Sequence, residues 1–180
     1  MKIAISGKSG CGNTTISALV AEKLKLDFIN FTFRSLAQEK EISFEKILEL
    51  AAGDDRWDRE VDSRQVKLAE DSSGCVLGSR LAIWMLKKAD LKVYLKARPL
   101  TRARRIVKRE GGTLESIAAF TAERDRQDHE RYMRIYGIDN DDYSFADMVI
   151  DTDDISAEEV VSLIIVQVQK SIYGEQDLKH

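Results

Sequence analysis

Near its start the chain reads Gly7-Lys8-Ser9-Gly10-Cys11-Gly12-Asn13-Thr14-Thr15, directly after the apolar run Ile3-Ala4-Ile5. Apolar side chains then recur at helical spacing from Ile16 to Leu24. Strand, glycine-rich turn and helix in this order form a phosphate-binding loop, because the N–H groups of the turn and the positive end of the helix converge on an anion. We expect all nine residues from Gly7 to Thr15 to bind the phosphates of a ligand, and the Thr14 hydroxyl to bind Mg²⁺.

One position of this loop departs from the P-loop pattern. Asn13 stands where the pattern has a lysine that contacts the β- and γ-phosphates, and an amide carries no charge. Lys8 directly follows the first glycine, and our hypothesis is that it supplies the missing charge from the other side of the loop. In the alternative interpretation Lys8 is a solvated loop residue, and the loop binds phosphate weakly.

Composition limits the possible partners. The chain has 180 residues, of which 28 are Lys or Arg and 31 are Asp or Glu, for a net charge of -3. This balance gives no reason to expect a nucleic acid polymer as a partner. No apolar run is long enough to span a membrane, and a strand at the very start leaves no room for a signal peptide. The two cysteines, Cys11 and Cys75, favour a reducing cytoplasm over a disulfide-forming compartment.

Short apolar runs alternate with helical patterns along the whole chain. This alternation predicts one α/β domain, residues 1–180, with a three-layer P-loop NTPase fold in which helices cover both faces of a parallel sheet. The last residues, from Tyr173, are expected to fray. The expected strands are 3–5, 26–31, 74–78, 91–95 and 148–150, and the expected helices are 16–24, 33–40, 43–53, 56–70, 79–88, 99–110, 113–136 and 157–172.

Cationic residues follow several of the expected strands. In an open parallel sheet the ligand lies beyond the carboxyl ends of the strands, so these positions share one crevice. Arg34 and Arg80 are candidates for holding a second phosphate, since guanidinium groups match phosphate oxygens bidentately. The alternative is that each arginine pairs with a surface carboxylate.

The helix after Pro99 presents Arg102, Arg105 and Arg109 on one face. One interpretation is a flap whose arginines, Arg105 and Arg109 among them, close over the transferring phosphoryl group, with Gly111-Gly112 as a hinge. The other is a solvated basic face.

Arg124, Asp128 and Arg131 lie on one face of the next helix, at spacings of four and three. The arrangement is either a surface ladder of ion pairs or a set in which an ionised carboxylate accepts from a base or sugar while an arginine takes phosphate.

The order of the motifs resembles one family. The chain's motifs follow one another as in cytidylate kinases of the short archaeal type. They are the phosphate loop, Phe33-Arg34, Asp62 with Arg64-Gln65, the segment 78–85, Arg131-Tyr132, the segment 135–139 and Val149-Ile150-Asp151-Thr152. The resemblance runs from Met1 to about Thr152. Arg124-Asp125, Asp128 and Arg131 are also similar to the Arg-Asp-x-x-Asp-x-x-Arg pattern of bacterial cytidylate kinases. Asn13 and Ser79 depart from the family pattern.

The resemblance implies a nucleoside monophosphate kinase with an acceptor-binding insert, about 31–64, and a lid, about 108–137. It implies transfer of the γ-phosphoryl group from ATP to CMP or dCMP, with Mg²⁺ and no dedicated general base. We expect the protein to be a monomer. By position, Arg34, Arg80 and Arg124 would grip the acceptor phosphate, Arg124 also acting in catalysis, while Asp128 and Arg131 would read the nucleoside. Two alternatives stay open: a nucleotide-binding protein of the same fold with impaired phosphotransfer, and a kinase of another small acceptor.

Overall fold

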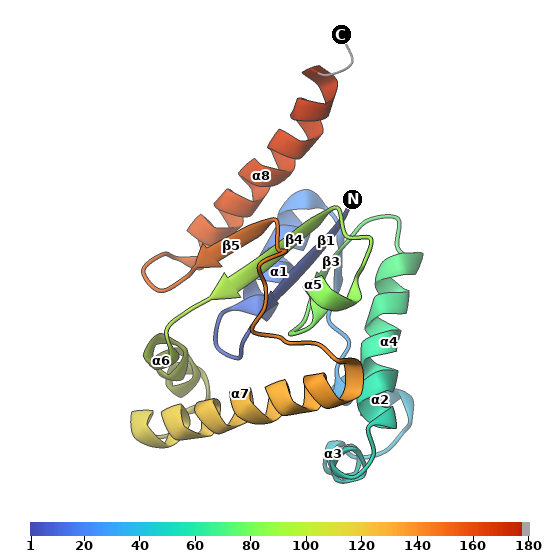
Figure 1. Cartoon of the computed structure of the whole chain (residues 1–180), viewed down its shortest axis with the longest axis vertical. Coiled ribbons are helices and arrows are strands. Elements are labelled where there is room, and N and C mark those ends of the chain that lie inside the picture. Colours follow the sequence, from blue (N-terminus) through green and yellow to red (C-terminus); the bar gives the residue numbers. More distant parts are fainter. Residues whose placement is uncertain (178–180) are drawn as a thin grey trace.

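A five-stranded parallel sheet organises the chain, with strand order β2-β3-β1-β4-β5 (Figure 1). The computed structural model describes the backbone of residues 1–177 and the side chains of residues 1–171. All four strand pairs are parallel. The expected α/β architecture is therefore confirmed. The strands are β1 (Lys2–Gly7), β2 (Asp27–Ile29), β3 (Cys75–Gly78), β4 (Leu91–Lys96) and β5 (Met148–Asp151).

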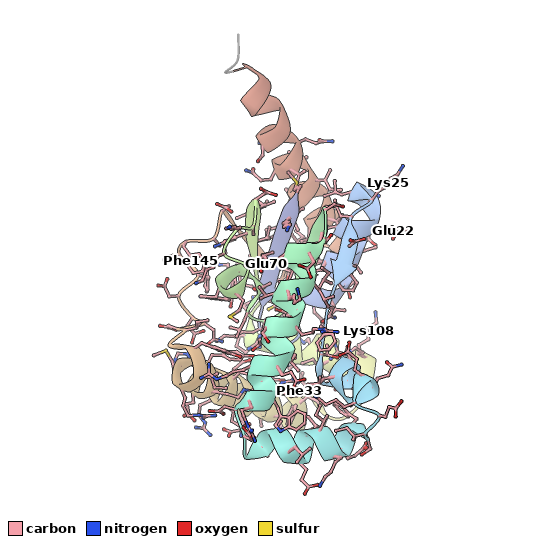
Figure 2. All side chains as sticks on the ribbon, turned by 90° about the vertical axis from the view of Figure 1, so that its right-hand side faces the viewer. Glu22, Lys25, Phe33, Glu70, Lys108 and Phe145 are labelled. Atoms are coloured by element: carbon pink, nitrogen blue, oxygen red, sulfur yellow. The ribbon has the colours of Figure 1, made fainter. Side chains whose placement is uncertain are left out.

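Alternate residues of the central strands pack on opposite faces of the sheet. Ile3 and Ile5 of β1 join the core under α1 (Asn13–Leu24) and α8 (Ala157–Asp177), whereas Ala4 joins a second core with α4 (Arg56–Asp71) and α5 (Ala82–Met85). This follows from the two-residue period of a strand. Figure 2 shows α1, with Glu22 and Lys25 exposed, and the segment bearing Phe145 on opposite sides of the sheet.

The segment between β2 and β3 forms a small helical unit of its own. It contains α2 (Phe33–Glu39), α3 (Phe44–Ala52) and α4, and the hydroxyls of Thr32 and Ser43 cap the first two helices. Leu36, Ala37, Ile47 and Val61 form a hydrophobic cluster separate from those of the sheet. The expected acceptor insert, residues 31–64, covers α2, α3 and the first half of α4, and its role as a separate binding unit stays a prediction.

Two helices follow β4 and run past the sheet. Pro99 begins α6 (Pro99–Glu110) at the position where its missing N–H costs nothing. Gly111 and Gly112 then turn the chain with φ angles of 83° and 92°, values that favour glycine. Beyond them α7 (Leu114–Tyr136) crosses from α6 to the insert (Figure 1). The expected lid, residues 108–137, corresponds to the end of α6 and all of α7, and its motion is likewise a prediction.

Two expected helices differ in length from those observed by more than three residues. A helix was expected over 79–88, but only Ala82–Met85 is helical. The N–H of Ser79 instead donates to the Ile5 carbonyl, so β1 holds the start of this segment outside the helix, and the Ser6 hydroxyl accepts from the Ile83 N–H in the first turn of α5. At the other end, α8 continues to Asp177 through part of the tail that was expected to fray; the rest of that tail, 178–180, lies outside the described residues.

Among the described residues, no helix combines the length and apolar character needed to cross a lipid bilayer.

Candidate active site

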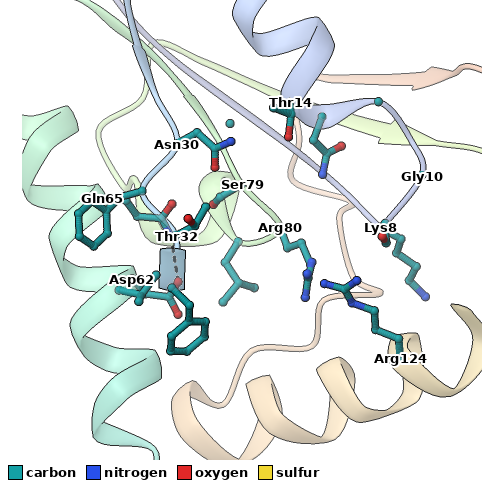
Figure 3. A pocket seen from close by; sticks show the side chains of 18 of the residues that line it. Lys8, Gly10, Thr14, Asn30, Thr32, Asp62, Gln65, Ser79, Arg80 and Arg124 are labelled. Atoms are coloured by element: carbon teal, nitrogen blue, oxygen red, sulfur yellow. Dashed lines mark hydrogen bonds between the residues drawn. The ribbon is translucent and has the colours of Figure 1, made fainter. Parts of the chain in front are cut away.

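A cavity with a volume of about 550 Å³ lies between the phosphate-binding loop, the helical insert and α7. Figure 3 shows Thr14 and Lys8 on one side of it and Asp62 and Gln65 on the other. Ser79 and Arg80, which follow β3, and Arg124 of α7 also line it. The cavity thus joins the carboxyl-terminal edge of the sheet to two later helices, as expected for an open parallel sheet.

The glycine loop is shaped to approach a ligand closely. Gly10 and Gly12 have φ angles of 86° and 99°, which L side chains rarely adopt. A Cβ at Gly10 would lie 2.9 Å from the Cβ of Arg102, so the loop also needs a glycine there for space. The Thr14 side chain is exposed to the cavity at the first turn of α1. An open loop at a helix N-terminus with a free hydroxyl fits a polyphosphate and its Mg²⁺ ion.

The Asn13 side chain forms a hydrogen bond within the loop itself. Its Nδ2 donates to the carbonyl of Gly7, which ties the two ends of the loop together. Its Oδ1 is buried, and no hydrogen bond to it forms within the described part of the chain. The residue at the lysine position therefore braces the loop backbone, a role that its sequence position did not suggest.

Lys8 lies at the wall of the cavity, but its ammonium group is paired elsewhere. Nζ of Lys8 is 2.5 Å from Oδ1 of Asp141, in the segment between α7 and β5. In Figure 3 the side chain extends away from Thr14. The structure thus places a positive charge beside the loop, while compensation for Asn13 by Lys8 stays a prediction.

Asp128 connects two of the expected substrate-binding arginines. Its side chain is almost wholly buried. One carboxylate oxygen accepts from Arg80 Nη1 at 2.5 Å, and the other accepts from Arg131 Nη2 at 2.7 Å. Arg131 Nε is also 3.4 Å from a carboxylate oxygen of Asp58. Arg80, Asp128 and Arg131 therefore lie together, and the Asp128 carboxylate holds both guanidinium groups.

Arg124 supplies a positive charge to the wall of the cavity. No salt bridge to it occurs among the residues that the structure describes, and it lines the cavity. Its guanidinium points toward that of Arg80 (Figure 3). Burial, and then the charge of Arg80, lower the pKa of Arg124 from its ordinary value. Because arginine keeps its charge even so, the pair favours an anion between or beside the two groups.

The three arginines of α6 that the sequence singled out have different surroundings. Arg102 is buried, pairs with Asp125 of α7 and donates to the Ser9 carbonyl at 3.1 Å. Arg105 donates to the Thr152 hydroxyl at 2.9 Å and the Gly10 carbonyl at 3.4 Å, while exposed Arg109 pairs with Glu110. Arg105 and Arg109 both line the cavity. Their closing over a phosphoryl group stays a prediction.

Arg34 does not line the cavity in this conformation. It is exposed on α2, and its guanidinium lies over the ring of Phe44, 3.9 Å from the centroid. Phe33, one residue earlier, lines the cavity, and a helical step of one residue turns the next side chain by about 100°. The expected grip of Arg34 on the acceptor phosphate stays a prediction and requires the side chain to move.

The opposite wall contains Asp62 and Gln65, which belong to the family motifs but were not among the predicted substrate-binding residues. Asp62 of α4 accepts from the Tyr136 hydroxyl at 2.6 Å and from Gln65 Nε2 at 2.8 Å. Burial raises the pKa of the Asp62 carboxyl, and hydrogen bonds from Tyr136 and Gln65 oppose the rise. A signal was available, because Asp62 and Gln65 lie three residues apart on one helical face.

Comparison with known proteins identifies the family. A sequence model of the cytidylate kinase-like family matches residues 2–154. The chain belongs to this family. It is 47% identical over 174 residues to cytidylate kinase 2 of Borreliella afzelii, a match that covers 94% of this chain and 97% of the relative. It is 41% identical over 164 residues to the cytidylate kinase of the archaeon Pyrococcus horikoshii, covering 90% and 85%. The expected resemblance is confirmed.

Solved structures with a similar fold are more distant in sequence. Shikimate kinase from Bacteroides thetaiotaomicron superimposes with a TM-score of 0.64 at 17% identity, covering 94% of this chain and 98% of that one. Deoxyadenosine kinase from M. mycoides gives a TM-score of 0.54 at 18% identity, covering 94% and 100%. At this identity the likeness supports the P-loop kinase fold and nothing finer.

Proposed function

We propose that this member of the cytidylate kinase-like family transfers the γ-phosphoryl group of ATP to CMP or dCMP, giving ADP and CDP or dCDP. An acceptor phosphate oxygen forms a bond to the γ-phosphorus as the bond between that phosphorus and the bridging oxygen of ADP breaks. One observation carries the proposal. A phosphate-binding loop and a separate polar wall face each other across a single cavity of about 550 Å³, which gives two nucleotides one meeting place.

The donor side is the glycine loop. Its backbone N–H groups and the N-terminus of α1 favour the β- and γ-phosphates of ATP. The exposed Thr14 hydroxyl is the residue that would hold Mg²⁺, which lowers the charge repulsion between phosphates when it is bound. Arg105, held between the loop and Thr152, adds positive charge at the same end of the cavity.

The acceptor side is organised around Arg80 and Arg124. Asp128 fixes the Arg80 guanidinium, while Arg124 has no carboxylate partner among the described side chains and is free to bind a phosphate. Phosphoryl transfer passes through a loose transition state that is stabilised by position and charge, so no general base is needed. Arg131, held by Asp128, lies in the same wall and is the next candidate for a substrate contact.

The two alternatives from the sequence are weaker. A nucleotide-binding protein without phosphotransfer is not favoured, since relatives at 36–47% identity carry the name cytidylate kinase. A kinase of another small acceptor draws support only from the fold, which shikimate kinase shares.

The deciding experiment measures ADP production by purified protein with ATP, Mg²⁺ and each of CMP, dCMP, UMP, AMP, GMP and shikimate. We expect turnover with CMP, dCMP or both to exceed turnover with every other acceptor. The proposal is wrong if none is phosphorylated while calorimetry detects ATP binding, or if shikimate is the best acceptor. The monomeric state and the cytoplasmic location stay predictions, and gel filtration with light scattering tests the first.

A further inference from the structure

Gln65 presents an unused hydrogen-bond acceptor in the wall of the cavity. Its side chain lies on the cavity-facing side of α4 and is only 3% exposed (Figure 3). Its Oε1 is buried, and no donor reaches it within the part of the chain that the structure describes. Since a buried polar atom without a partner is unfavourable, a ligand that donates a hydrogen bond here removes a cost already present in the free protein.

The neighbouring carboxylate determines which end of the amide is unused. Gln65 Nε2 donates to Asp62 Oδ1 at 2.8 Å, and Asp62 Oδ2 accepts from the Tyr136 hydroxyl at 2.6 Å. An ionised carboxylate only accepts, so turning the amide over would place Oε1 against Oδ1, two acceptors in contact. Asp62, held by Tyr136, therefore keeps the carbonyl end of Gln65 directed away from it.

The surroundings of Gln65 suit a flat heteroaromatic ring. Phe31 and Phe33, next to β2, pack in one hydrophobic cluster with Val61 of α4, and all three line the same cavity as the Gln65 amide. Arg80 and Arg124 also line the cavity, and they form a cationic site for the phosphate end of a nucleotide. This division of apolar and cationic walls sets the base toward α4 and the phosphate toward α7.

We propose that the Gln65 carbonyl accepts a hydrogen bond from the exocyclic amino group of the acceptor's base, with Asp62 and Tyr136 as positioning residues. The assignment rests on the proposed function. Cytosine has an amino group at C4, whereas uracil has a carbonyl there, and two carbonyls cannot hydrogen-bond to each other. Gln65 therefore contributes discrimination between CMP and UMP. Asp128 and Arg131 were expected to read the nucleoside. Because these two side chains bind each other in the structure, we infer that Gln65 shares this role with them.

The experiment compares kcat/KM for CMP and UMP in the wild type and in Gln65→Met, which keeps the side-chain length and removes the amide. We expect kcat/KM for CMP to fall about tenfold or more, the value for UMP to change by less than about threefold, and KM for ATP to be unchanged. Ser63→Ala is the matched control, since Ser63 lies on the exposed face of α4 and its hydroxyl donates to the Glu60 carbonyl of the same helix. Equal losses with both nucleotides would overturn the assignment.

The Asp62→Asn variant provides a second, independent test of the Gln65 assignment. An amide at position 62 can donate as well as accept, so Gln65 can turn over and present its NH₂ group to the cavity. The CMP-to-UMP ratio should then fall through a gain with UMP, a result that mere damage to the helix does not produce. An unchanged ratio in a folded Asp62→Asn protein would contradict the proposed positioning.

Failure of the two proposals can be told apart. If the wild type phosphorylates no nucleoside monophosphate, the proposed function fails, and calorimetric binding of CMP and UMP to wild type and Gln65→Met decides the Gln65 assignment without turnover. Tighter binding of CMP than UMP that is lost in the variant supports it. Equal binding of the two nucleotides by the wild type refutes it.

Discussion

The Lys8 ammonium and the Asp141 carboxylate form a salt bridge of 2.5 Å that joins the phosphate-binding loop to the segment between α7 and β5. The lysine side chain is 29% exposed and that of the aspartate 53%, so the pair is only partly shielded from solvent. Bridges of this kind contribute about 0–1 kcal/mol. The several negative charges of ATP can therefore compete with Asp141 for Lys8.

Replacing Lys8 tests whether it takes the place of the absent lysine. We expect Lys8→Ala to lower kcat/KM for ATP by about 10- to 100-fold, because one charge on the transferring phosphate is lost. Asp141→Asn frees the ammonium and should leave kcat intact and lower KM for ATP. Steady-state kinetics at saturating CMP measures both. Lys96→Ala, which removes a half-exposed cation near the same strand ends, is the control. An undiminished rate in Lys8→Ala would end the compensation hypothesis.

Lysine introduced at Asn13 tests the same hypothesis from the other side. In the wild type we expect Asn13→Lys to change kcat/KM by less than about threefold, because the gain of a charge is offset by loss of the Asn13 bond to the Gly7 carbonyl. In the Lys8→Ala background the same substitution should restore most of the lost rate. A double-mutant cycle on kcat/KM measures this coupling. Additive effects would mean that the two positions serve different purposes.

The sheet and the phosphate loop could be predicted from the sequence because each depends on short-range pattern. Ile3-Ala4-Ile5, the glycines after them and the apolar period from Ile16 lie within about twenty residues, and each signal agrees with the next. The Arg124, Asp128 and Arg131 face was also predictable, since helical spacing alone brings the three side chains together.

The partners of the site residues could not be predicted in the same way. Lys8 with Asp141 and Arg102 with Asp125 join residues far apart in the sequence, and many carboxylates could have served each cation. For Arg34, the position after a strand was not enough to predict where the side chain points. The strand-end rule placed it at the crevice, but one helical step and the ring of Phe44 direct it away from the cavity. The free acceptor on Gln65 depends on Tyr136, 71 positions later, and no local pattern reports it.

The buried pair of Arg102 and Asp125 should be a main attachment between the lid region and the phosphate loop. Arg102 makes bonds of 3.2 and 2.6 Å to the Asp125 carboxylate and a further one to the Ser9 carbonyl. Asp125→Ala would leave a buried guanidinium unpaired, and we expect it to lower the free energy of unfolding by about 3 kcal/mol. Urea denaturation followed by circular dichroism measures the change.

A neighbouring arginine provides the control for this prediction. Arg126 is 57% exposed and pairs with Glu123 and Glu130 on the outer face of α7. Arg126→Ala should change stability by no more than about 0.5 kcal/mol, because exposed pairs contribute little. Similar losses in Asp125→Ala and Arg126→Ala would contradict the proposed attachment.

Cys11, at the centre of the phosphate loop, should be an unreactive thiol in the native protein. The side chain is 2% exposed, and burial raises the pKa of the thiol from 9.0 to about 11. At pH 8 the reactive thiolate therefore falls from about 10% of the thiol to about 0.1%. Burial also raises the pKa of Cys75, the second thiol. Native protein should react with a thiol-specific disulfide reagent at least about 100-fold more slowly than urea-unfolded protein, which should release two equivalents.

Both the reaction rate of the Cys11 thiol and its contribution to stability should change with pH in a defined direction. Between pH 8 and 10 the native reaction rate of Cys11 should rise about tenfold per pH unit, since the thiolate fraction does so below the pKa. The unfolded thiol ionises near 9.0 while the native thiol keeps its proton until about 11, so this group's contribution to stability is present below pH 9 and is lost as the pH rises toward 11. Cys11→Ala assigns the signal to its residue. Rapid modification of one thiol in native wild type at pH 8, absent from Cys11→Ala, would show that the loop opens and exposes Cys11 to solvent.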